Sequence, residues 1–345
     1  MRIAVFSKYF GYNVGGAERS VLAIMHSLEA EGNTIVAYVN REPRQYGAGE
    51  RRFGLPASWD VREFSLPVDW TRFRFVEYMA NHRTLQSIAG SMSDIDVLYA
   101  YGHMSPAVLL AFPGKRVYLV RDEYGLGWNR NYYRGWRGAL QELYLAAEAP
   151  LRAVWQRDLM RVLRSSVLIA NSRFIAREMA RLSGGRSVEL IPPQLDTAAL
   201  RWEYVRASRE KPVTRGVVVV GDNVLKGGDI VRRVARLMPD VPFYLFDRRY
   251  RTEEPAGNIT LMPWQASAGA VYRHASLVMV PSRVNEAFPR VIIEAQSLGI
   301  PVVASNRGGI PEAMDDRSML IDDIESPAEW IGKIRAHYAL AGQMS

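Results

Sequence analysis

Two glutamates, Glu286 and Glu294, stand eight positions apart in the segment EAFPRVIIEAQ at 286–296. Glu286 precedes an apolar run that is typical of a helix, and Glu294 lies within that run. Ionised carboxylates accept hydrogen bonds from several hydroxyl groups at once, whereas a helix N-terminus attracts anions through its free N–H groups and its dipole. A nucleotide sugar carries both hydroxyl groups and phosphates, so the pattern favours a nucleotide-sugar site.

The elements that would position these glutamates can be predicted from the same stretch. The segment LVMVPS at 277–282 is typical of a buried strand. Pro289 suits the first turn of a helix because its missing N–H group is not needed there, and Gly299 is a typical helix stop. We therefore expect Glu286 in the loop between the strand and the helix, and Glu294 about one turn inside the helix.

Short β-branched runs alternate with longer helical patterns along the chain, which predicts an α/β fold with parallel sheets covered by helices. Strands are expected at 2–7, 34–39, 96–101, 116–121, 167–172 and 187–192, and again at 216–221, 242–246, 258–262, 277–282 and 301–306. The polar stretch between the two series has no strand pattern. We therefore expect two Rossmann-like domains, at 1–200 and 215–345, joined by a linker at 201–214, with ligands bound in a cleft at the carboxyl ends of both sheets.

The composition excludes several classes of protein. The 345 residues include no cysteine, so neither disulfide bonds nor thiolate zinc sites are possible. No apolar run approaches the roughly 18 residues that span a bilayer, and we expect a cytoplasmic protein. The net charge of +8 suits anionic partners such as nucleotides or phospholipid headgroups. No nucleic-acid-binding signature accompanies this charge, and nucleic acid is not an expected partner.

The chain resembles the retaining glycosyltransferases of family 4, whose E-x7-E motif is matched by Glu286 and Glu294. Further segments that resemble the family are 15–39, 167–182, 191–200, 217–229 and 300–314. The resemblance implies a GT-B fold, in which two Rossmann-like domains with parallel sheets face a central cleft. The first domain would lie on the acceptor side, and the second would bind the nucleotide-sugar donor.

The resemblance also implies a reaction. A sugar would pass from a nucleotide-diphosphate sugar to a hydroxyl group of a glycan or lipid-linked acceptor, in the synthesis of a cell-surface polysaccharide or glycolipid. The family's usual interpretation is attack from the front face of the donor, whose own phosphate takes the acceptor proton. Donor base, sugar and acceptor are not implied.

Several residues acquire roles through this resemblance. Glu294 would bind the nucleotide ribose, and Glu286 would bind hydroxyl groups of the donor sugar. Lys226 would contact the donor diphosphate, and Gly16 lies in the glycine-rich loop that would close over it. Each of these residues also has a plainer interpretation, as a solvated glutamate, a turn lysine or a turn glycine.

The second domain departs from the family pattern at Asp222, where an arginine usually shares the diphosphate with the lysine. An aspartate cannot neutralise a diphosphate, so Lys226, the helix N-terminus and another cation would have to do so. Arg283 and Arg290 are candidates because they lie close by in the sequence.

Pro289 stands where the family often has glycine, which removes one N–H donor at the start of the motif helix. The backbone N–H groups of Phe288 and Arg290 can still bind the donor, and both residues are predicted to do so.

The first domain departs from the pattern at Arg121 and Asp122, where many members have His-Asp after the strand. Tyr101 likewise replaces a histidine at the end of the preceding strand, and His103 follows two residues later. With Glu286, Arg121 and Asp122 are our candidate catalytic residues, although both could instead pair with other charges at a domain surface. If Arg121 faces the cleft, a carboxylate or phosphate on donor or acceptor is its natural partner.

No metal site is expected. Asp94 and Asp96 form a D-x-D pair, but they precede a strand and so belong at the amino edge of the sheet, away from the cleft. The five histidines show no ligand spacing. The prediction is a metal-independent enzyme without a cofactor, in which the nucleotide sugar is a co-substrate.

The segment 128–164 interleaves arginines with tryptophans and tyrosines. This composition suits peripheral contact with the inner face of a membrane or with a lipid-linked acceptor. The alternative is a long helix whose aromatic face belongs to the core of the first domain.

Two other functions remain open at this point. A nucleotide-sugar-binding subunit that has lost transfer activity would account for Asp222 and for the missing histidines. A GT-B epimerase would act on the same nucleotide sugar without an acceptor, but it needs acid and base groups for which the sequence offers no clear pair.

Overall fold

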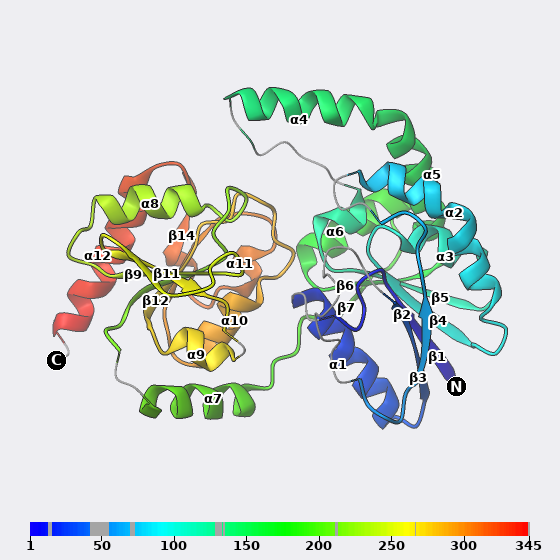
Figure 1. Cartoon of the computed structure of the whole chain (residues 1–345), viewed down its shortest axis with the longest axis horizontal. Coiled ribbons are helices and arrows are strands. Elements are labelled where there is room, and N and C mark those ends of the chain that lie inside the picture. The colour runs from blue at the N-terminus through cyan, green and yellow to red at the C-terminus, as the bar shows by residue number, and fades with distance from the viewer. Residues whose placement is uncertain are drawn as a thin grey trace. The chain divides into compact units, whose positions relative to one another are not determined.

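The computed structural model of the protein describes residues 1–12, 16–41, 55–69, 73–127, 133, 135–210, 213–265 and 267–343. The chain forms two compact units, Met1–Gln194 and Leu195–Ser345, which we call unit 1 and unit 2. Within the described residues, each unit contains a seven-stranded sheet with helices on both faces (Figure 1).

The sheet of unit 1 has the strand order β3-β2-β1-β4-β5-β6-β7, and all neighbouring strands in it are parallel. The strands are β1 (Arg2–Phe6), β2 (Thr34–Asn40), β3 (Asp60–Phe64), β4 (Val97–Tyr101), β5 (Lys115–Val120), β6 (Val167–Ala170) and β7 (Glu189–Leu190). Central strands of such a sheet are apolar on both faces because helices cover both of them. In β1, for example, Ala4, Val5 and Phe6 are fully buried.

The helices of unit 1 are α1 (Gly16–Ala30), α2 (Arg74–Gly90), α3 (Ser105–Ala111), α4 (Gly135–Ala147), α5 (Ala149–Ser165) and α6 (Arg173–Ser183), and the 3₁₀ helix η2 (Glu123–Leu126) follows β5. Local sequence sets the ends of α6. The Ser172 hydroxyl accepts a hydrogen bond from Ile175 N at 3.2 Å, and Gly184 ends the helix in the left-handed conformation.

The sheet of unit 2 has the strand order β10-β11-β9-β8-β12-β13-β14, in which the edge strand β10 is antiparallel and the other strands are parallel. The strands are β8 (Gly216–Val220), β9 (Phe243–Asp247), β10 (Glu254–Ala256), β11 (Ile259–Pro263), β12 (Ala275–Val280), β13 (Val302–Ser305) and β14 (Leu320–Ile321). The helices are α7 (Thr197–Glu210), α8 (Gly228–Arg236), α9 (Ala268–Tyr272), α10 (Arg290–Ser297), α11 (Ile310–Ala313) and α12 (Pro327–Gln343), with the 3₁₀ helix η3 (Arg317–Met319).

The segment expected to be a linker at 201–214 is mostly helix. It begins inside α7, which packs against α9 of unit 2, and the boundary between the units lies at Gln194 rather than at 200. Only Leu200 and Ala207 of this helix are buried. A surface helix with so narrow a buried face has the polar composition of a linker, which explains the incorrect boundary.

Each strand predicted from the sequence overlaps an observed strand, but the prediction omits β3, β10 and β14. Charged residues occupy three of the five positions of β3, DVREF, so it lacks an apolar run. The residues of β10 are exposed at the sheet edge, and β14 has only two residues.

Both sheets have a topological switch point, where the strand order reverses direction. It lies between β1 and β4 in unit 1 and between β8 and β12 in unit 2. The loops that follow the two strands diverge there, and open α/β sheets bind ligands in the resulting crevice at the carboxyl ends of the strands. The residues that follow these strands are therefore the candidates for function.

Candidate functional site

Lys226 and Glu286, which lie 60 residues apart in the sequence, meet at the switch point of unit 2. Lys226 follows β8, and Glu286 follows the neighbouring strand β12. The Lys226 ammonium group forms an ion pair with Glu286 Oε1, and Ser282 Oγ donates a hydrogen bond to the same oxygen at 2.7 Å. Two residues with predicted roles on the diphosphate and the sugar are thus brought into contact.

The environment of Glu286 keeps its carboxyl group ionised. Burial alone would raise the pKa of Glu286, but the Lys226 ammonium group and the Ser282 hydroxyl lower that pKa below its ordinary value. At neutral pH the carboxylate is therefore a pure hydrogen-bond acceptor, which suits it to bind sugar hydroxyl groups.

Two glycines allow the backbone to pack tightly around this pair. Gly227 has φ 77°, and a Cβ atom there would lie 2.1 Å from the Pro281 carbonyl oxygen. Gly308 has φ 56°, and a Cβ atom there would lie 2.6 Å from the Glu286 carbonyl oxygen. Only glycine fits both positions without strain.

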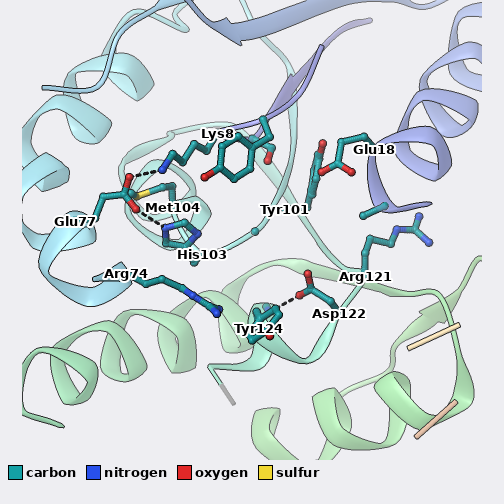
Figure 2. A pocket seen from close by; sticks show the side chains of 15 residues that line it. Lys8, Glu18, Arg74, Glu77, Tyr101, His103, Met104, Arg121, Asp122 and Tyr124 are labelled. Atoms are coloured by element: carbon teal, nitrogen blue, oxygen red, sulfur yellow. Dashed lines mark hydrogen bonds and ion pairs between the residues drawn. The ribbon is translucent and has the colours of Figure 1, made fainter. Parts of the chain in front are cut away.

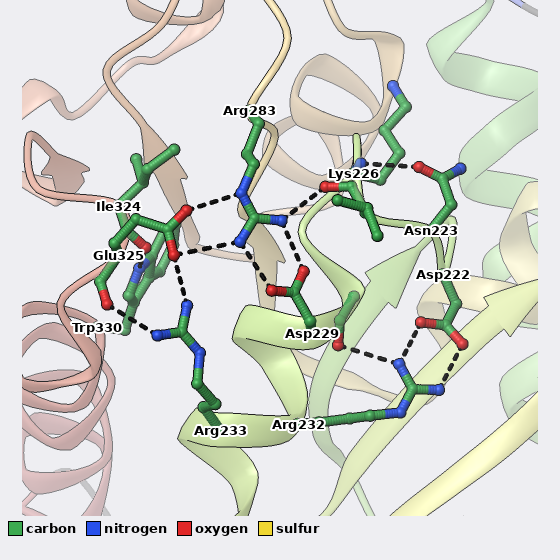
Figure 3. Close-up of polar contacts among 12 residues, drawn as sticks. Asp222, Asn223, Lys226, Asp229, Arg232, Arg233, Arg283, Ile324, Glu325 and Trp330 are labelled. Atoms are coloured by element: carbon green, nitrogen blue, oxygen red, sulfur yellow. Dashed lines mark hydrogen bonds and ion pairs between the residues drawn. The ribbon is translucent and has the colours of Figure 1, made fainter. Parts of the chain in front are cut away.

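The loop that contains Lys226 and Gly227 is also held by a side chain. Asn223 Oδ1 accepts a hydrogen bond from Lys226 N at 2.9 Å (Figure 3).

Glu294 is held in place by two donors. It lies in the second turn of α10, is 8% exposed, and accepts a hydrogen bond from the Tyr272 hydroxyl at 2.9 Å and one from Arg290 Nε at 3.2 Å. Tyr272 could not be predicted from the motif, because it lies 22 residues away from Glu294.

Phe288 and Arg290 lie at the start of α10, as predicted, where Pro289 is the N-cap residue. The Phe288 ring is half-buried and packs against the core of unit 2. The ribose-binding role of Glu294 and the diphosphate-binding roles of the two N–H groups stay predictions.

Asp222 is part of a buried ion-pair cluster rather than of an exposed phosphate edge. Its side chain is 4% exposed, and Arg232 contacts both carboxylate oxygens, one of them at 2.5 Å (Figure 3). The Tyr250 hydroxyl donates a hydrogen bond to Asp222, and Arg249 Nη2 lies 3.1 Å from Asp222 Oδ2. Burial would raise the pKa of Asp222, but Arg232 and Tyr250 lower it. The negative charge is therefore neutralised locally.

Arg283 is not available as the replacement cation. It donates to Asp229 Oδ1 at 2.6 Å and to Glu325 Oε1 at 2.7 Å, and its side chain is 10% exposed (Figure 3). It connects α8 with the chain before α12, which is a structural role.

Unit 1 contains a cavity of about 360 Å³ at its own switch point (Figure 2). It is lined by residues that follow β1, β4 and β5 and by the first turns of α1 and α2. Arg121, Asp122 and Tyr101, which the sequence singled out, all contribute to this lining, and so does His103.

A buried network on one side of the cavity was not predicted from the sequence. The Lys8 ammonium group, 2% exposed, contacts Asp69 Oδ1 at 2.5 Å and forms an ion pair with Glu77. Glu77 Oε2 also lies 3.2 Å from His103 Nε2 (Figure 2). Burial lowers the pKa of His103 in spite of Glu77, so the imidazole is neutral at neutral pH. These residues come from separate segments, and no short motif could have indicated the network.

Arg121 and Asp122 do not pair with opposite charges among the described residues, which contradicts the interpretation as surface ion pairs. Arg121 is 6% exposed, and its Nη1 donates to the Ile191 carbonyl oxygen at 2.9 Å. Burial lowers the pKa of Arg121 to about 10. Asp122 caps η2 by accepting a hydrogen bond from Gly125 N at 2.8 Å, and burial raises its pKa.

Gly16 is the first residue of α1 and is exposed. Residues 13–15 of the glycine-rich loop lie outside the described residues, so the closing of this loop over the donor stays a prediction.

The D-x-D pair lies at the amino end of β4, as expected. Asp94 accepts a hydrogen bond from Arg62 Nη1 at 2.8 Å, and Asp96 accepts one from the Arg2 backbone N–H at 2.8 Å. Both carboxylates thus stabilise the edge of the sheet that is opposite to the cavity. The metal-independence of the protein stays a prediction.

The segment 128–164 contains two helices rather than one, and residues 128–132 and 134 lie outside the described residues. Trp155 of α5 is fully buried in the core of unit 1, whereas Trp136 of α4 is 69% exposed. The core interpretation therefore holds for α5 and not for α4.

Known proteins resemble the chain along most of its length. Residues 14–199 match the family described as Glycosyltransferase Family 4, and residues 213–339 match that described as Glycosyl transferases group 1. The D-inositol 3-phosphate glycosyltransferase of Segniliparus rotundus is 32% identical over an alignment of 200 residues that covers 50% of this chain and 44% of the relative. That of Mycolicibacterium gilvum is 32% identical over an alignment of 193 residues that covers 49% of this chain and 43% of the relative. The matched region thus spans less than half the length of these relatives.

Solved structures share the arrangement of elements. HepE of Anabaena in complex with UDP-glucose has a TM-score of 0.64 at 17% identity, covering 97% of this chain and 89% of HepE. WaaG, described as a glycosyltransferase involved in lipopolysaccharide biosynthesis, has a TM-score of 0.67 at 15% identity, covering 98% of this chain and 90% of WaaG. Identities this low establish the fold alone. Because the first family match alone covers more than half of the chain, and because both sheets match GT-B structures, this protein belongs to glycosyltransferase family 4 and has the GT-B fold.

Proposed function

We propose that the protein is a retaining glycosyltransferase that transfers a sugar from a nucleotide-diphosphate sugar to an acceptor hydroxyl group. The observation that carries the proposal is the Lys226–Glu286 ion pair at the switch point of unit 2. The pair supports the proposal because an ammonium group can bind phosphate, and the ionised carboxylate beside it can accept hydrogen bonds from sugar hydroxyl groups. The UDP-glucose complex of HepE supports a nucleotide-sugar donor.

The charges of unit 2 are compatible with a bound diphosphate. Asp222 does not repel the ligand, because Arg232 and Arg249 neutralise it. Lys226 keeps 39% of its side chain exposed, so its ammonium group can contact a phosphate oxygen while it stays near Glu286. The N-terminus of α10 supplies the second positive element.

A partly exposed tryptophan ring at the same edge of the sheet supports the binding of a nucleobase. Arg248 follows β9 and Trp264 follows the neighbouring strand β11. The Arg248 guanidinium group lies 5.1 Å from the centre of the Trp264 ring, which is 42% exposed. Exposed aromatic rings bind bases through their faces, and we assign the base to Trp264.

The proposed reaction needs no enzyme nucleophile. The bond between the anomeric carbon and the leaving phosphate oxygen breaks, and the acceptor oxygen forms a bond on the same face of the sugar. The acceptor proton passes to the leaving phosphate, so a nucleoside diphosphate departs. Glu286 orients the sugar through its hydroxyl groups, and Lys226 stabilises the charge that develops on the phosphate.

We assign the acceptor to unit 1, because its cavity lies at the carboxyl ends of parallel strands. The acceptor class predicted from the sequence, a glycan or a lipid-linked molecule, stays part of the proposal. WaaG is described as a glycosyltransferase involved in lipopolysaccharide biosynthesis, whereas the curated relatives are named D-inositol 3-phosphate glycosyltransferases, and these two descriptions support a lipid-linked and a small phosphorylated acceptor respectively.

We also propose that α4 contacts an anionic membrane surface. Its exposed apolar residues Trp136, Leu140 and Leu143 are spaced to share one face of the helix, and each is more than half exposed. Arg137 stacks near Trp136, and Arg157 and Arg161 on α5 are exposed. Such a combination binds the interface of an anionic bilayer. No helix within the described ranges is both long and apolar enough to span a bilayer, so the contact would be peripheral.

Thermal unfolding in the presence of UDP-, GDP- and dTDP-sugars tests the donor site, because a ligand of the native state raises its apparent stability. A stabilising donor is then incubated with candidate acceptors, and the anomeric configuration of the product is read by NMR. Retained configuration and turnover in EDTA are expected. Stabilisation without transfer would instead indicate the nucleotide-sugar-binding subunit, and a changed donor sugar without an acceptor would indicate the epimerase.

A further inference from the structure

Arg121 carries a buried positive charge that no carboxylate among the described residues neutralises. It is 6% exposed, and within the described part of the chain its guanidinium group makes one hydrogen bond, from Nη1 to the Ile191 carbonyl oxygen. Its Nε and Nη2 atoms are buried and have no partner within the described residues. Lys8, at the opposite side of the same cavity, is 2% exposed but contacts both Asp69 and Glu77.

The contrast with Lys8 shows that Arg121 is not a completed structural ion pair. A buried ionised group without a partner destabilises the folded state, and a guanidinium group offers five N–H donors. The pKa of Arg121, about 10, keeps the group protonated at neutral pH. Most of its hydrogen-bonding capacity is therefore not used by the residues that the structure describes.

The acidic residues around the cavity do not satisfy Arg121. Asp122 points toward η2 and accepts a hydrogen bond from Gly125 N (Figure 2). Glu77 is engaged by Lys8 and His103. Glu18 of α1 also lines the cavity, but no ion pair joins it to Arg121 among the described contacts.

Arg74 adds a second positive charge to the lining. Its guanidinium group lies 3.8 Å from the centre of the Tyr124 ring and forms no ion pair with any described acid. Two arginines thus contribute to the cavity without an acidic partner. The cavity volume, about 360 Å³, lies in the lower part of the range of small-molecule pockets.

We propose that Arg121 binds an oxyanion, a phosphate monoester or a carboxylate, on a small polyhydroxylated acceptor that occupies the cavity of unit 1. An oxyanion can accept two parallel hydrogen bonds from one guanidinium group, which would use both Nε and Nη2. Asp122 and Glu18 are placed to accept hydrogen bonds from hydroxyl groups of the same molecule. This inference rests on the proposed function, which it deepens by naming the charge of the acceptor.

Calorimetry without a donor tests the inference directly. The probes are myo-inositol 1-phosphate, glucose 6-phosphate and glucuronate, each compared with its neutral counterpart, myo-inositol or glucose. The full-length protein is expected to bind at least one anionic probe at least tenfold more tightly than the neutral one. The phosphate and carboxylate probes distinguish the two sources of the oxyanion.

Three variants locate the binding site. Arg121→Gln is expected to bind the anionic probe roughly 10- to 150-fold more weakly than the parent, because the charge-assisted hydrogen bonds disappear. The variant should therefore lose the preference for the anionic probe. Lys226→Ala, in the donor site of unit 2, should keep the preference. Arg181→Gln is the matched control, because this arginine of α6 is 64% exposed and does not line the cavity.

The melting temperature of the ligand-free protein separates binding from a structural role. Removing an unpaired buried charge should leave the melting temperature of Arg121→Gln equal to that of the parent or raise it, whereas loss of a structural contact lowers it. Equal binding of anionic and neutral probes to the parent, including no binding of either, overturns the inference, and so does an Arg121→Gln variant that keeps the preference. Nucleotide-sugar binding is measured on the same samples, so failure of the proposed function is seen independently.

Discussion

Arg121 in unit 1 and Asp222 in unit 2 occupy comparable places, each just beyond the end of a buried strand and each less than one-tenth exposed. Asp222 is surrounded by Arg232, Arg249 and Tyr250, which neutralise it and satisfy its oxygens. Among the residues that the structure describes, the Arg121 guanidinium group has one carbonyl partner and no acidic partner. The difference teaches that the type of a charged residue does not reveal its role: partners make Asp222 structural, and their absence leaves Arg121 open to a ligand.

The same contrast extends to the two switch points. In unit 2, Lys226 and Glu286 form an ion pair, so both side chains are ionised before any ligand binds. In unit 1, burial lowers the pKa of Arg121, and it raises that of Asp122 in spite of the opposing effect of Arg74. We therefore expect substitutions in unit 2 to affect donor binding and transfer, and those at Arg121 to affect acceptor affinity.

The largest effect is expected for Glu286→Ala. Loss of the carboxylate that orients the donor sugar should lower kcat by about 100-fold or more, since positioning contributes mainly in the transition state. Affinity for the free nucleoside diphosphate should stay within a fewfold of the parent, because that ligand lacks the sugar. Steady-state kinetics and calorimetry with the diphosphate measure the two quantities. A normal kcat in this variant would show that Glu286 is not part of the active site.

Glu294→Ala should weaken binding of the nucleoside diphosphate itself, by roughly 10- to 150-fold, because a charge-assisted hydrogen bond to the ribose is lost. Tyr272→Phe is the graded comparison, since it removes only the hydroxyl group that holds Glu294 at 2.9 Å. A smaller loss is expected for it. Undiminished binding by Glu294→Ala in calorimetry would refute the ribose assignment.

Lys226→Ala should weaken the binding of the donor diphosphate by about tenfold, which is toward the lower end of the range for charged hydrogen bonds. The reason for the smaller effect is that 39% of the lysine side chain is exposed, where water and salt screen the interaction. Affinity is measured for the same nucleotide sugar at two salt concentrations. If the variant binds like the parent at both, the diphosphate lies elsewhere.

Asp222→Ala should act on stability rather than on the donor. It leaves Arg232, Arg249 and Tyr250 without their shared acceptor, which should cost about 1–3 kcal/mol in the free energy of unfolding. Donor affinity should change less than twofold. Chemical denaturation measures the free energy of unfolding, and calorimetry measures the donor affinity. A variant with unchanged stability but altered donor affinity would show that Asp222 belongs to the phosphate-binding site.

Asp222 also shows how far the sequence can be read. The sequence revealed that an aspartate replaces the expected arginine, but it could not show that Arg232 and Tyr250, 10 and 28 residues away, enclose it. The strands of both sheets could be predicted because buried parallel strands are continuous apolar runs. Glu286 and Lys226 were found because a motif places them, and the structure added their contact.

The other features that the sequence did not predict have one physical cause in common. They depend on contacts between residues that are far apart in the sequence, and local patterns do not reveal such contacts. Helix α7 has a polar composition and becomes part of unit 2 through the packing of residues such as Leu200 and Ala207 and through the hydrogen bond from Ser267 to Glu203. The network of Lys8, Glu77 and His103 joins three segments that no motif connects. The family motif therefore indicated residues of unit 2 that lie together in the structure, whereas no motif indicated the residues that meet at the cavity of unit 1.

The last prediction concerns His274, a buried histidine of unit 2 that resembles His103 of unit 1 in staying neutral. Burial lowers the pKa of His274 to about 4, beside the rings of Tyr244 and Phe246. Between that value and the unfolded pKa of about 6.5, the unfolded chain binds more protons. The contribution of His274 is therefore fully present above pH 6.5 and is lost as the pH falls toward 4.

His274→Phe should therefore reduce the acid sensitivity of unfolding by about 1–2 kcal/mol between pH 7 and pH 5. The measurement is the free energy of unfolding by urea at both pH values, compared between variant and parent, so that any constant cost of the substitution cancels. His26→Gln is the control, because His26 lies on α1 with 48% of its side chain exposed, and it should leave the difference unchanged. An unaltered difference in His274→Phe would show that His274 is not kept neutral by burial. The acid sensitivity would then originate from the carboxylates whose pKa values the ion pairs of unit 2 lower, such as Asp222 and Glu286.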